Sequence, residues 1–341
     1  MASDIAEQPA VYARLLGDGA PGIAKVAAEI ARRRPRFVVY TARGTSDHAA
    51  LYAAYLTEIR LGIPTGLASP SAITVYGARP DFADSLVIGV SQSGGSPDLV
   101  EVIRVAREQG ACTLAVCNNP DSPLGAAAEL VVDIAAGHER AVAATKTYTA
   151  ELLALLMLIE GVRAGDGGLP ADERSRLARL PELAQVLIDD RTATELAPRY
   201  RFAEQLITTG RGYAYPTARE TALKLMETSY LAALAFSGAD LLHGPLAMAD
   251  PDVPVLAMVG GGLAGESMRA VLAKLGERRA DVVSVGPSGA LGLHIPTPDV
   301  DERYAPLLDI IPMQQLALAL ALSRGEDPDA PRSLLKVTET R

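Results

Sequence analysis

The chain has 341 residues, enough for two ordinary domains or one large one. Hydrophobic residues make up 49% of it and charged residues 21%, a balance that excludes a disordered or collagen-like chain. The formal net charge is -9, and aromatic residues are only 4%, with no Trp. Such a chain repels a phosphate backbone and offers few rings on which bases could stack, so we expect no nucleic-acid partner.

The cysteines and the chain's apolar runs indicate a cytoplasmic protein. Cys112 and Cys117 lie in one apolar run, at a spacing that fits neither a CxxC metal site nor a redox pair. The histidines lie in separate segments, so we predict no metal site and no cofactor. The first residues are acidic where an export signal needs positive charge, and the apolar runs 152–159 and 316–322 are far below the roughly 18 residues of a membrane span.

Along the chain, short runs rich in Val and Ile alternate with amphipathic stretches, which is the pattern of βαβ units around a mostly parallel sheet. In the first half, the predicted strands are 37–41, 86–90, 112–117 and 130–134. In the second half, they are 206–209, 253–259 and 281–285. The order predicts an α/β fold.

The second half of the sequence repeats the first. Residues 41–58 align with 209–227, and both segments open with Arg-Gly after a strand. Residues 86–116 align with 254–285, but the second copy has Gly where the first has Ser. Residues 165–173 are rich in Gly and Pro and are interpreted as a linker, so we place the domain boundary near 165.

The loop of residues 91–96, SQSGGS, connects a predicted strand to a predicted helix. Ser96 is a good N-cap, and Pro97 is preset for the first helical position. A helix N-terminus exposes unpaired N–H groups with partial positive charge, and Gly94 and Gly95 let the backbone approach a ligand. An anion therefore fits here without a lysine.

A monophosphate is the anion that this loop suits best. Ser91, Ser93 and Ser96 supply hydroxyls, and Thr45 and Ser46, after the first strand, would add more at the same sheet edge. The sequence lacks the G-K-[ST] of a nucleotide P-loop and the G-x-G-x-x-G of a dinucleotide site. The alternative is a Ser/Gly turn without a ligand.

Acid, base and histidine candidates lie in the second half. Glu220, Lys224 and Glu227 are spaced four and three residues apart, so they share one helix face. A solvated ion-pair ladder is the alternative. His243 stands beside Gly244-Pro245, at a turn that we expect to enter an apolar, strand-like run. It is either a positioned catalytic residue or a structural one.

Six motifs together carry a family resemblance. They are GTS (44–46), SQSGGS (91–96), AVAATKTYTAELLALL (141–156), ETALKLMETSY (220–230), LLHGPLAM (241–248) and PRSLLKVTE (331–339). In this order they resemble the isomerase half of glucosamine-6-phosphate synthase, a double sugar-isomerase (SIS) domain, and its stand-alone relatives that deaminate or isomerise amino-sugar phosphates. The resemblance implies two similar three-layer αβα domains of flavodoxin-like type, residues 1–165 and 166–323. A tail, 324–341, would close over the active site.

The resemblance also implies roles. Glu227 would move a proton between C1 and C2 of an open-chain sugar. His243 would assist ring opening, at the partner subunit's site in a homodimer, and Lys336 would form a Schiff base with a ketose carbonyl. The implied phosphate ligands are Ser46, Ser91, Gln92, Ser93 and Ser96. The implied supporting residues are Thr45, Ala144, Thr145, Glu220 and Lys224.

The sequence departs from the synthase in ways that bear on the substrate. No glutaminase domain precedes the first repeat, so we expect that glutamine is not the ammonia source. Gly95 stands where the synthase has an acidic residue, Ala144 replaces a serine, Met226 a lysine and Tyr213 an aspartate. The smaller side chains at 95 and 144 would make room for an N-substituent such as acetyl.

The function expected first is that of an amino-sugar-6-phosphate deaminase/isomerase, which converts glucosamine-6-phosphate to fructose-6-phosphate and ammonia. Three alternatives stay open. They are a lyase that removes water from N-acetylglucosamine-6-phosphate, a deglycase acting on a fructosamine-6-phosphate, and a sugar-phosphate sensor without catalysis.

Overall fold

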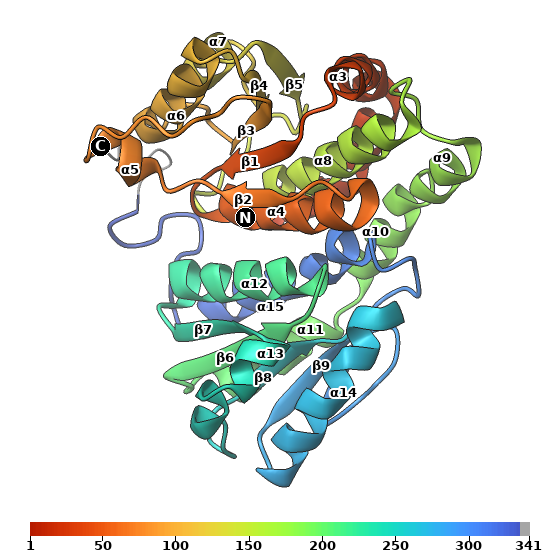
Figure 1. Cartoon of the computed structure of the whole chain (residues 1–341). Helices are drawn as coiled ribbons and strands as arrows, with labels where there is room; N and C mark the ends of the chain where they lie inside the picture. The colour runs from red at the N-terminus through yellow and green to blue at the C-terminus, as the bar shows by residue number, and fades with distance from the viewer. Residues whose placement is uncertain (335–341) are drawn as a thin grey trace. The chain divides into compact units, whose positions relative to one another are not determined.

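The computed structural model describes residues 1–334 and contains two five-stranded parallel sheets (Figure 1). The chain divides into two compact units with one sheet each. The first-sheet unit comprises Glu7–Glu139 and Lys146–Pro181. The second-sheet unit comprises Met1–Ala6, Arg140–Thr145 and Glu182–Leu334. Lys336 and the end of the predicted tail lie outside the described residues.

The first sheet has the strand order β2-β1-β3-β4-β5, with all neighbours parallel. Its strands are β1 (Phe37–Thr41), β2 (Thr65–Leu67), β3 (Ser85–Ser91), β4 (Cys112–Cys117) and β5 (Leu130–Asp133). One face carries α3 (Ala20–Arg33), α4 (Thr45–Leu56) and α8 (Lys146–Ala164). The other face carries α5 (Pro70–Thr74), α6 (Pro97–Glu108) and α7 (Pro123–Ala127). This unit also contains α2 (Gln8–Arg14), η1 (Leu15–Gly19), η2 (Thr57–Leu61) and α9 (Ala171–Leu177), and α10 (Leu180–Asp189) begins in it.

The second sheet has the order β10-β9-β8-β6-β7, again all parallel. Its strands are β6 (Gln205–Gly210), β7 (Ala232–Ser237), β8 (Val255–Met258), β9 (Val282–Gly286) and β10 (Leu293–Pro296). α12 (Ala214–Ser229) and α15 (Ala305–Ser323) cover one face, and α13 (Gly238–Leu242) and α14 (Gly262–Glu277) the other. The remaining elements are α1 (Ala2–Ala6), α11 (Thr192–Leu196), η3 (Ala197–Tyr200) and η4 (Pro245–Met248).

The two sheets have the same topology, because β6, β7, β8, β9 and β10 take the places of β1, β2, β3, β4 and β5. The predicted α/β fold, with two similar three-layer αβα arrangements around parallel sheets, is therefore confirmed. All seven predicted strands form, and β1 and β4 begin and end at the predicted residues. β2, β7 and β10 were not predicted. Each is an edge strand, and an edge strand needs no continuous Val/Ile run because it is not buried on all sides.

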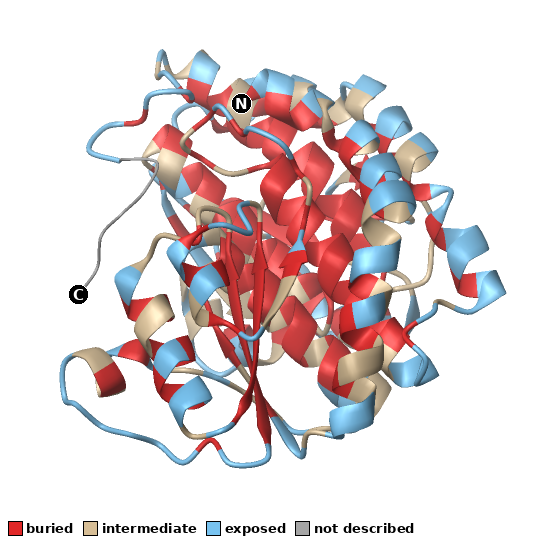
Figure 2. Cartoon of the chain, turned by 90° about the horizontal axis from the view of Figure 1, so that it is seen from above, coloured by how far each residue is buried: buried red, intermediate tan, exposed pale blue. Residues whose placement is uncertain are grey.

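The strands and the helices beside them form the buried part of the chain (Figure 2). Every residue of β3 and β4 is buried, as expected for parallel strands covered on both faces. Both cysteines lie in β4 and are free and buried. Burial raises the pKa of each thiol, so neither is an activated nucleophile.

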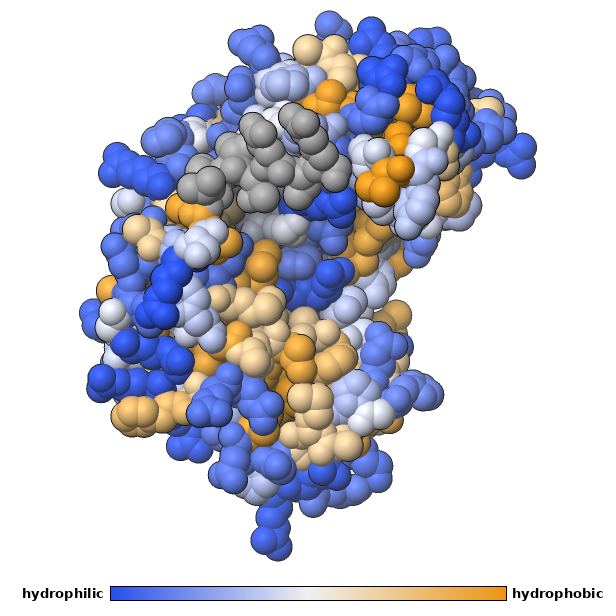
Figure 3. Space-filling view, turned by 90° about the vertical axis from the view of Figure 1, so that its left-hand side faces the viewer, coloured by the Kyte–Doolittle hydropathy of each residue, from blue (hydrophilic) through white to orange (hydrophobic). Residues whose placement is uncertain are grey.

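The surface in Figure 3 is largely hydrophilic, with smaller apolar patches between the charged residues. In the described part of the chain, only α15 is long and apolar enough to cross a membrane, and 83% of its window is buried inside the protein. Core helices of globular proteins have the same character. The apolar run 316–322 is thus part of a buried helix.

α15 also buries a carboxyl group. Asp309 is 2% exposed, and burial raises its pKa from 3.8 to about 7, against a smaller lowering by the Thr297 hydroxyl. A raised pKa means that the folded state holds this proton more tightly than the unfolded state. This group's contribution to stability is therefore fully present near pH 4 and is lost as the pH rises to about 7.

Replacing the Asp309 carboxyl group by an amide, which does not ionise, should remove the loss of stability that occurs between about pH 4 and pH 7. We compare the unfolding free energy of Asp309→Asn with that of the parent protein. The difference in favour of the variant should increase by up to about 4 kcal/mol between about pH 4 and pH 7, and should stay constant above pH 7. Urea unfolding at several pH values measures it. The exposed Asp252→Asn is the control and should show no such trend. A pH-independent difference for Asp309→Asn would contradict the prediction.

Candidate active site

The loop of residues 91–96, called the serine loop from here on, runs from the end of β3 to the start of α6. The backbone N–H of Gly94 donates to Ser91 Oγ at 3.1 Å, and that of Gly95 donates to Ser93 Oγ at 3.2 Å. Each hydroxyl thus acts as an acceptor within the loop. Because a hydroxyl also carries one proton to donate, both keep that proton for a ligand.

The Ser96 hydroxyl, at the end of the loop, is also available to donate a hydrogen bond to a ligand. Ser96 is the extended N-cap of α6, and its side chain makes no capping hydrogen bond. The carbonyls of Gln92 and Gly94 accept from the backbone N–H groups of Asn118 and Leu124, at 3.3 and 3.0 Å. The carbonyls of Gln92 and Gly94 are therefore used by the protein, while the hydroxyl protons of the loop remain available as donors to an anion.

Gly94 fixes the shape of the loop. Its φ is +64°, and a Cβ at this position would lie 2.0 Å from Ser122 Oγ, at the start of α7. Any side chain at 94 would push the loop away from α7. The close approach therefore requires glycine for two reasons, the backbone angle and the missing space.

Ser46 makes a contact that the sequence did not indicate. Its hydroxyl donates to Glu151 Oε1 on α8 at 2.7 Å, and both side chains are buried. The Ser46 proton is thus directed at a carboxylate. Ser46 would donate to a phosphate only by giving up this hydrogen bond, so its role as a phosphate ligand stays a prediction. Thr45, beside it, is the first residue of α4.

In the second-sheet unit, α12 carries a buried charge triad. Lys224 Nζ lies 3.2 Å from Glu220 Oε1 and 2.5 Å from Glu227 Oε2. Glu220 and Lys224 are buried, and the Glu227 side chain is 22% exposed. The solvated ladder considered above is therefore wrong: two of the three groups are inaccessible to water, and only Glu227 reaches it.

The triad is held together by charge. Burial alone would lower the pKa of Lys224, but the carboxylates of Glu220 and Glu227 outweigh burial and raise it well above its ordinary value. Lys224 is therefore a cation at neutral pH. It fixes the Glu227 carboxylate against one face of α12, with the exposed part of Glu227 available to a ligand.

The other predicted residues are placed as follows. His243 directly follows α13 and is exposed, and the next residues form η4 rather than the expected strand-like run. Gly244, with φ +136°, makes the reversal that stops the chain from extending. Thr145 is buried, and its carbonyl accepts from Gln314 Nε2 at 3.2 Å. Ala144, next to it, is partly buried.

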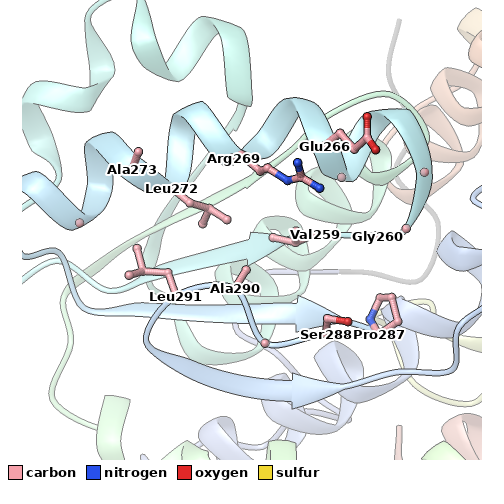
Figure 4. A pocket seen from close by; sticks show the side chains of 15 residues that line it. Val259, Gly260, Glu266, Arg269, Leu272, Ala273, Pro287, Ser288, Ala290 and Leu291 are labelled. Carbon is pink, nitrogen blue, oxygen red and sulfur yellow. The ribbon is translucent and has the colours of Figure 1, made fainter.

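The second sheet has a glycine loop where the first has the serine loop. Gly260, Gly261 and Gly262 line a cavity of about 630 Å³, over which Arg269 extends from α14 (Figure 4). The backbone N–H of Ala264, in the first turn of α14, donates to Glu302 Oε2 at 3.3 Å. A protein carboxylate thus caps this helix, and no serine lies in the loop. Of the two repeats, the first has the better anion site.

The serine loop's geometry predicts a specific cost for a methyl group at 94. Gly94→Ala should lower the unfolding free energy by about 2 kcal/mol or more and weaken binding of inorganic phosphate, because both φ and Ser122 oppose it. Gly77→Ala is the matched control: Gly77 has the same φ of +64° but open space around its Cβ position. It should cost about 1 kcal/mol and leave phosphate binding unchanged. Equal effects of both changes would contradict the prediction.

The triad predicts a large stability effect from a single residue. Lys224→Met leaves two carboxylates without their cation, so the unfolding free energy should fall by about 3 to 5 kcal/mol. Lys274→Met removes an exposed lysine that pairs with Glu277 at 2.9 Å, and should change it by less than about 1 kcal/mol. Denaturant unfolding compares the two variants. A loss for Lys224→Met no larger than the control's would refute the triad's structural role.

Comparisons with known proteins agree with this architecture. The family model described as SIS domain matches residues 32–161 and 200–288. A glutamine–fructose-6-phosphate aminotransferase (isomerizing) of Gloeobacter violaceus is 38% identical over 306 residues, which cover 86% of this chain and 50% of that protein. The chain thus spans about half the length of the curated relatives it matches.

Two solved structures share the fold over nearly the whole chain. A protein of Silicibacter pomeroyi DSS-3, provisionally assigned as a phosphosugar isomerase, has a TM-score of 0.86 and 34% identity, with 96% of this chain and 99% of that chain covered. The C-terminal domain of glucosamine-fructose-6-phosphate aminotransferase from Francisella tularensis has a TM-score of 0.87 and 26% identity, with 96% of each chain covered. With both repeats matched and both sheets present, the chain belongs to the SIS domain family, among sugar-phosphate isomerases.

Proposed function

We propose that the chain is an amino-sugar-6-phosphate deaminase/isomerase that converts glucosamine-6-phosphate and water to fructose-6-phosphate and ammonia. Membership of the SIS family and the relatives named for fructose-6-phosphate support the substrate class. The observation that carries the proposal is the serine loop, whose hydroxyls accept from the loop's own backbone and keep their protons for an anion. Glu227 supplies a fixed carboxylate for proton transfer.

The serine loop would hold the phosphate group. Ser91, Ser93 and Ser96 donate their hydroxyl protons to phosphate oxygens, the side chain of Gln92 adds an amide, and the N-terminus of α6 adds partial positive charge. Anchoring the sugar at C6 leaves C1 and C2 at the other end of the molecule, in a restricted orientation. This restriction converts proton transfer into a step between fixed partners.

Glu227 would act as the base. In the open-chain aldehyde, the proton on C2 is acidic because the carbonyl at C1 accepts the electrons. Glu227 removes this proton and returns it to C1, while O1 takes up a proton from solvent and the amino nitrogen releases one. A hydroxymethyl group at C1 and an imine at C2 result. Water adds to that imine and ammonia departs, so the ketone of fructose-6-phosphate forms. Base and acid steps by one positioned carboxylate are typical of this chemistry.

His243 would serve the closed form of the sugar. Ring opening moves a proton from the anomeric hydroxyl to the ring oxygen. Near neutral pH, an imidazole can accept the first proton as a base and donate one to the ring oxygen as an acid. We propose that the exposed His243 does so at the partner subunit's site in a homodimer. Lys336, as the Schiff-base lysine, stays a prediction because it lies outside the described residues.

Product analysis tests the reaction. The purified protein is incubated with glucosamine-6-phosphate, and ammonia and fructose-6-phosphate are measured by coupled assays. Equal amounts of both products are expected. Parallel reactions contain N-acetylglucosamine-6-phosphate, a fructosamine-6-phosphate, or fructose-6-phosphate with ammonia or glutamine.

Each other outcome points to a different activity. Ultraviolet absorbance from the acetylated substrate, without ammonia, identifies the lyase, for which the small residues at 95 and 144 leave room. Release of an amino acid from the fructosamine identifies the deglycase. Amination of fructose-6-phosphate by glutamine would refute the expected independence of glutamine. Tight binding of a sugar phosphate without any turnover would indicate a sensor.

Glu227→Gln should separate catalysis from binding. The amide keeps the size of the side chain but cannot accept the C2 proton, so kcat should fall by about 100-fold or more, while the KM changes by only a few-fold. Glu277→Gln, on the exposed face of α14, is the matched control and should retain full activity. Unchanged turnover by Glu227→Gln would exclude this residue as the base.

A further inference from the structure

We infer that Arg43 is a phosphate-binding residue of the serine loop. The inference rests on the proposed function, since it concerns the sugar-phosphate ligand of the same loop. Arg43 follows β1 and directly precedes the GTS motif at 44–46. The six motifs that carry the family resemblance do not include Arg43.

Arg43 is fixed at the N-terminal turn of α6. Its Nε donates to Asp98 Oδ2 at 2.8 Å, and its Nη2 lies 2.7 Å from the same oxygen. Asp98 is 2% exposed, and its Oδ1 accepts from the backbone N–H of Leu99 at 3.0 Å. The ion pair thus joins the β1–α4 turn to the first turn of α6, where the serine loop ends.

The ion pair leaves most of the guanidinium unused. A guanidinium has five N–H donors, and Asp98 engages two of them through one oxygen. The other donors have no partner among residues 1–334, and the Arg43 side chain is 49% exposed. The free donors are those that a phosphate takes up in a bidentate arrangement.

The charges around the loop explain why a cation is needed. Asp98 stands in the first turn of α6, and Glu151 lies behind Ser46. A phosphate that carries up to two negative charges would be repelled by both carboxylates, and the chain's net charge is -9. Arg43 pairs with the buried Asp98 and is itself half exposed, so its positive charge offsets this carboxylate and would attract the phosphate.

The second repeat supports the assignment by contrast. In the alignment of the two halves, Arg43 and Asp98 fall on Arg211 and Glu266. This second pair makes no ion pair within the described structure, and its loop consists of glycines capped by Glu302. The arginine is thus bound to its acidic partner only in the repeat that has the hydroxyl-rich loop.

Binding measurements test the inference without requiring turnover. Inorganic phosphate and glucosamine-6-phosphate are titrated into the purified protein by calorimetry, with glucosamine as the ligand that lacks phosphate. Arg43→Met should weaken binding of both phosphates about 10-fold or more, and leave binding of glucosamine unchanged. Arg104→Met is the matched control: Arg104 also pairs with carboxylates of α6, but on its exposed face away from the loop.

A double variant separates phosphate binding from a structural role. Arg43→Met alone leaves Asp98 unpaired, whereas Arg43→Met with Asp98→Asn removes both charges. If Arg43 binds phosphate, the double variant stays at least 5-fold weaker than the parent protein, and if it only neutralises Asp98, the double variant regains the parent's affinity. The second result would overturn the inference, and so would a parent protein that binds neither phosphate.

The two proposals fail in different ways. Phosphate binding that depends on Arg43, without conversion of any sugar phosphate, would refute the reaction and keep this inference. Full deaminase activity and unchanged phosphate affinity in folded Arg43→Met would refute this inference and keep the reaction.

Discussion

A helix N-terminus binds an external anion only where the protein has not already used its donors. The serine loop meets this condition through its hydroxyls, because Ser91 and Ser93 accept from their own backbone and keep a proton to donate. At α6 itself, the backbone N–H of Leu99 already donates to Asp98. The shape of the serine loop depends on Gly94, which has a positive φ and lies too close to Ser122 for any side chain. At the corresponding helix of the second repeat, α14, the backbone N–H of Ala264 donates to Glu302, and the preceding loop has glycines in place of serines.

The polar and charged groups near both candidate sites are fixed by partners, which come from other segments for Asp98 and Ser46 and from the same helix for Lys224. Asp98 is held by Arg43, Ser46 directs its proton to Glu151, and Lys224 joins Glu220 to Glu227. A buried charge without a partner costs several kcal/mol, so each group stays in one geometry. This rigidity suits catalysis, because a carboxylate that abstracts a proton must not move when the sugar binds.

The duplication has produced two units with one topology and different chemistry. Both sheets have the same strand order, and both first turns carry Arg-Gly. The first repeat has serines at the loop after its third strand, and the second has glycines. The second repeat instead carries the triad on α12, with a carboxylate that reaches solvent. In the proposed function, the first repeat would anchor the phosphate and the second would supply the base for proton transfer.

The sequence alone determined seven of the ten described strands, the repeat and the serine loop, because these follow from local periodicity and turn residues. It missed the edge strands β2, β7 and β10, which lack an apolar run of their own and form by pairing with a neighbour. It left open whether the helix face that carries Glu220 and Glu227 is solvated. It gave no sign that Ser46 donates to Glu151, or that Arg43 forms an ion pair with Asp98. Burial and side-chain partners depend on segments far apart in the chain, so only the tertiary structure decided them.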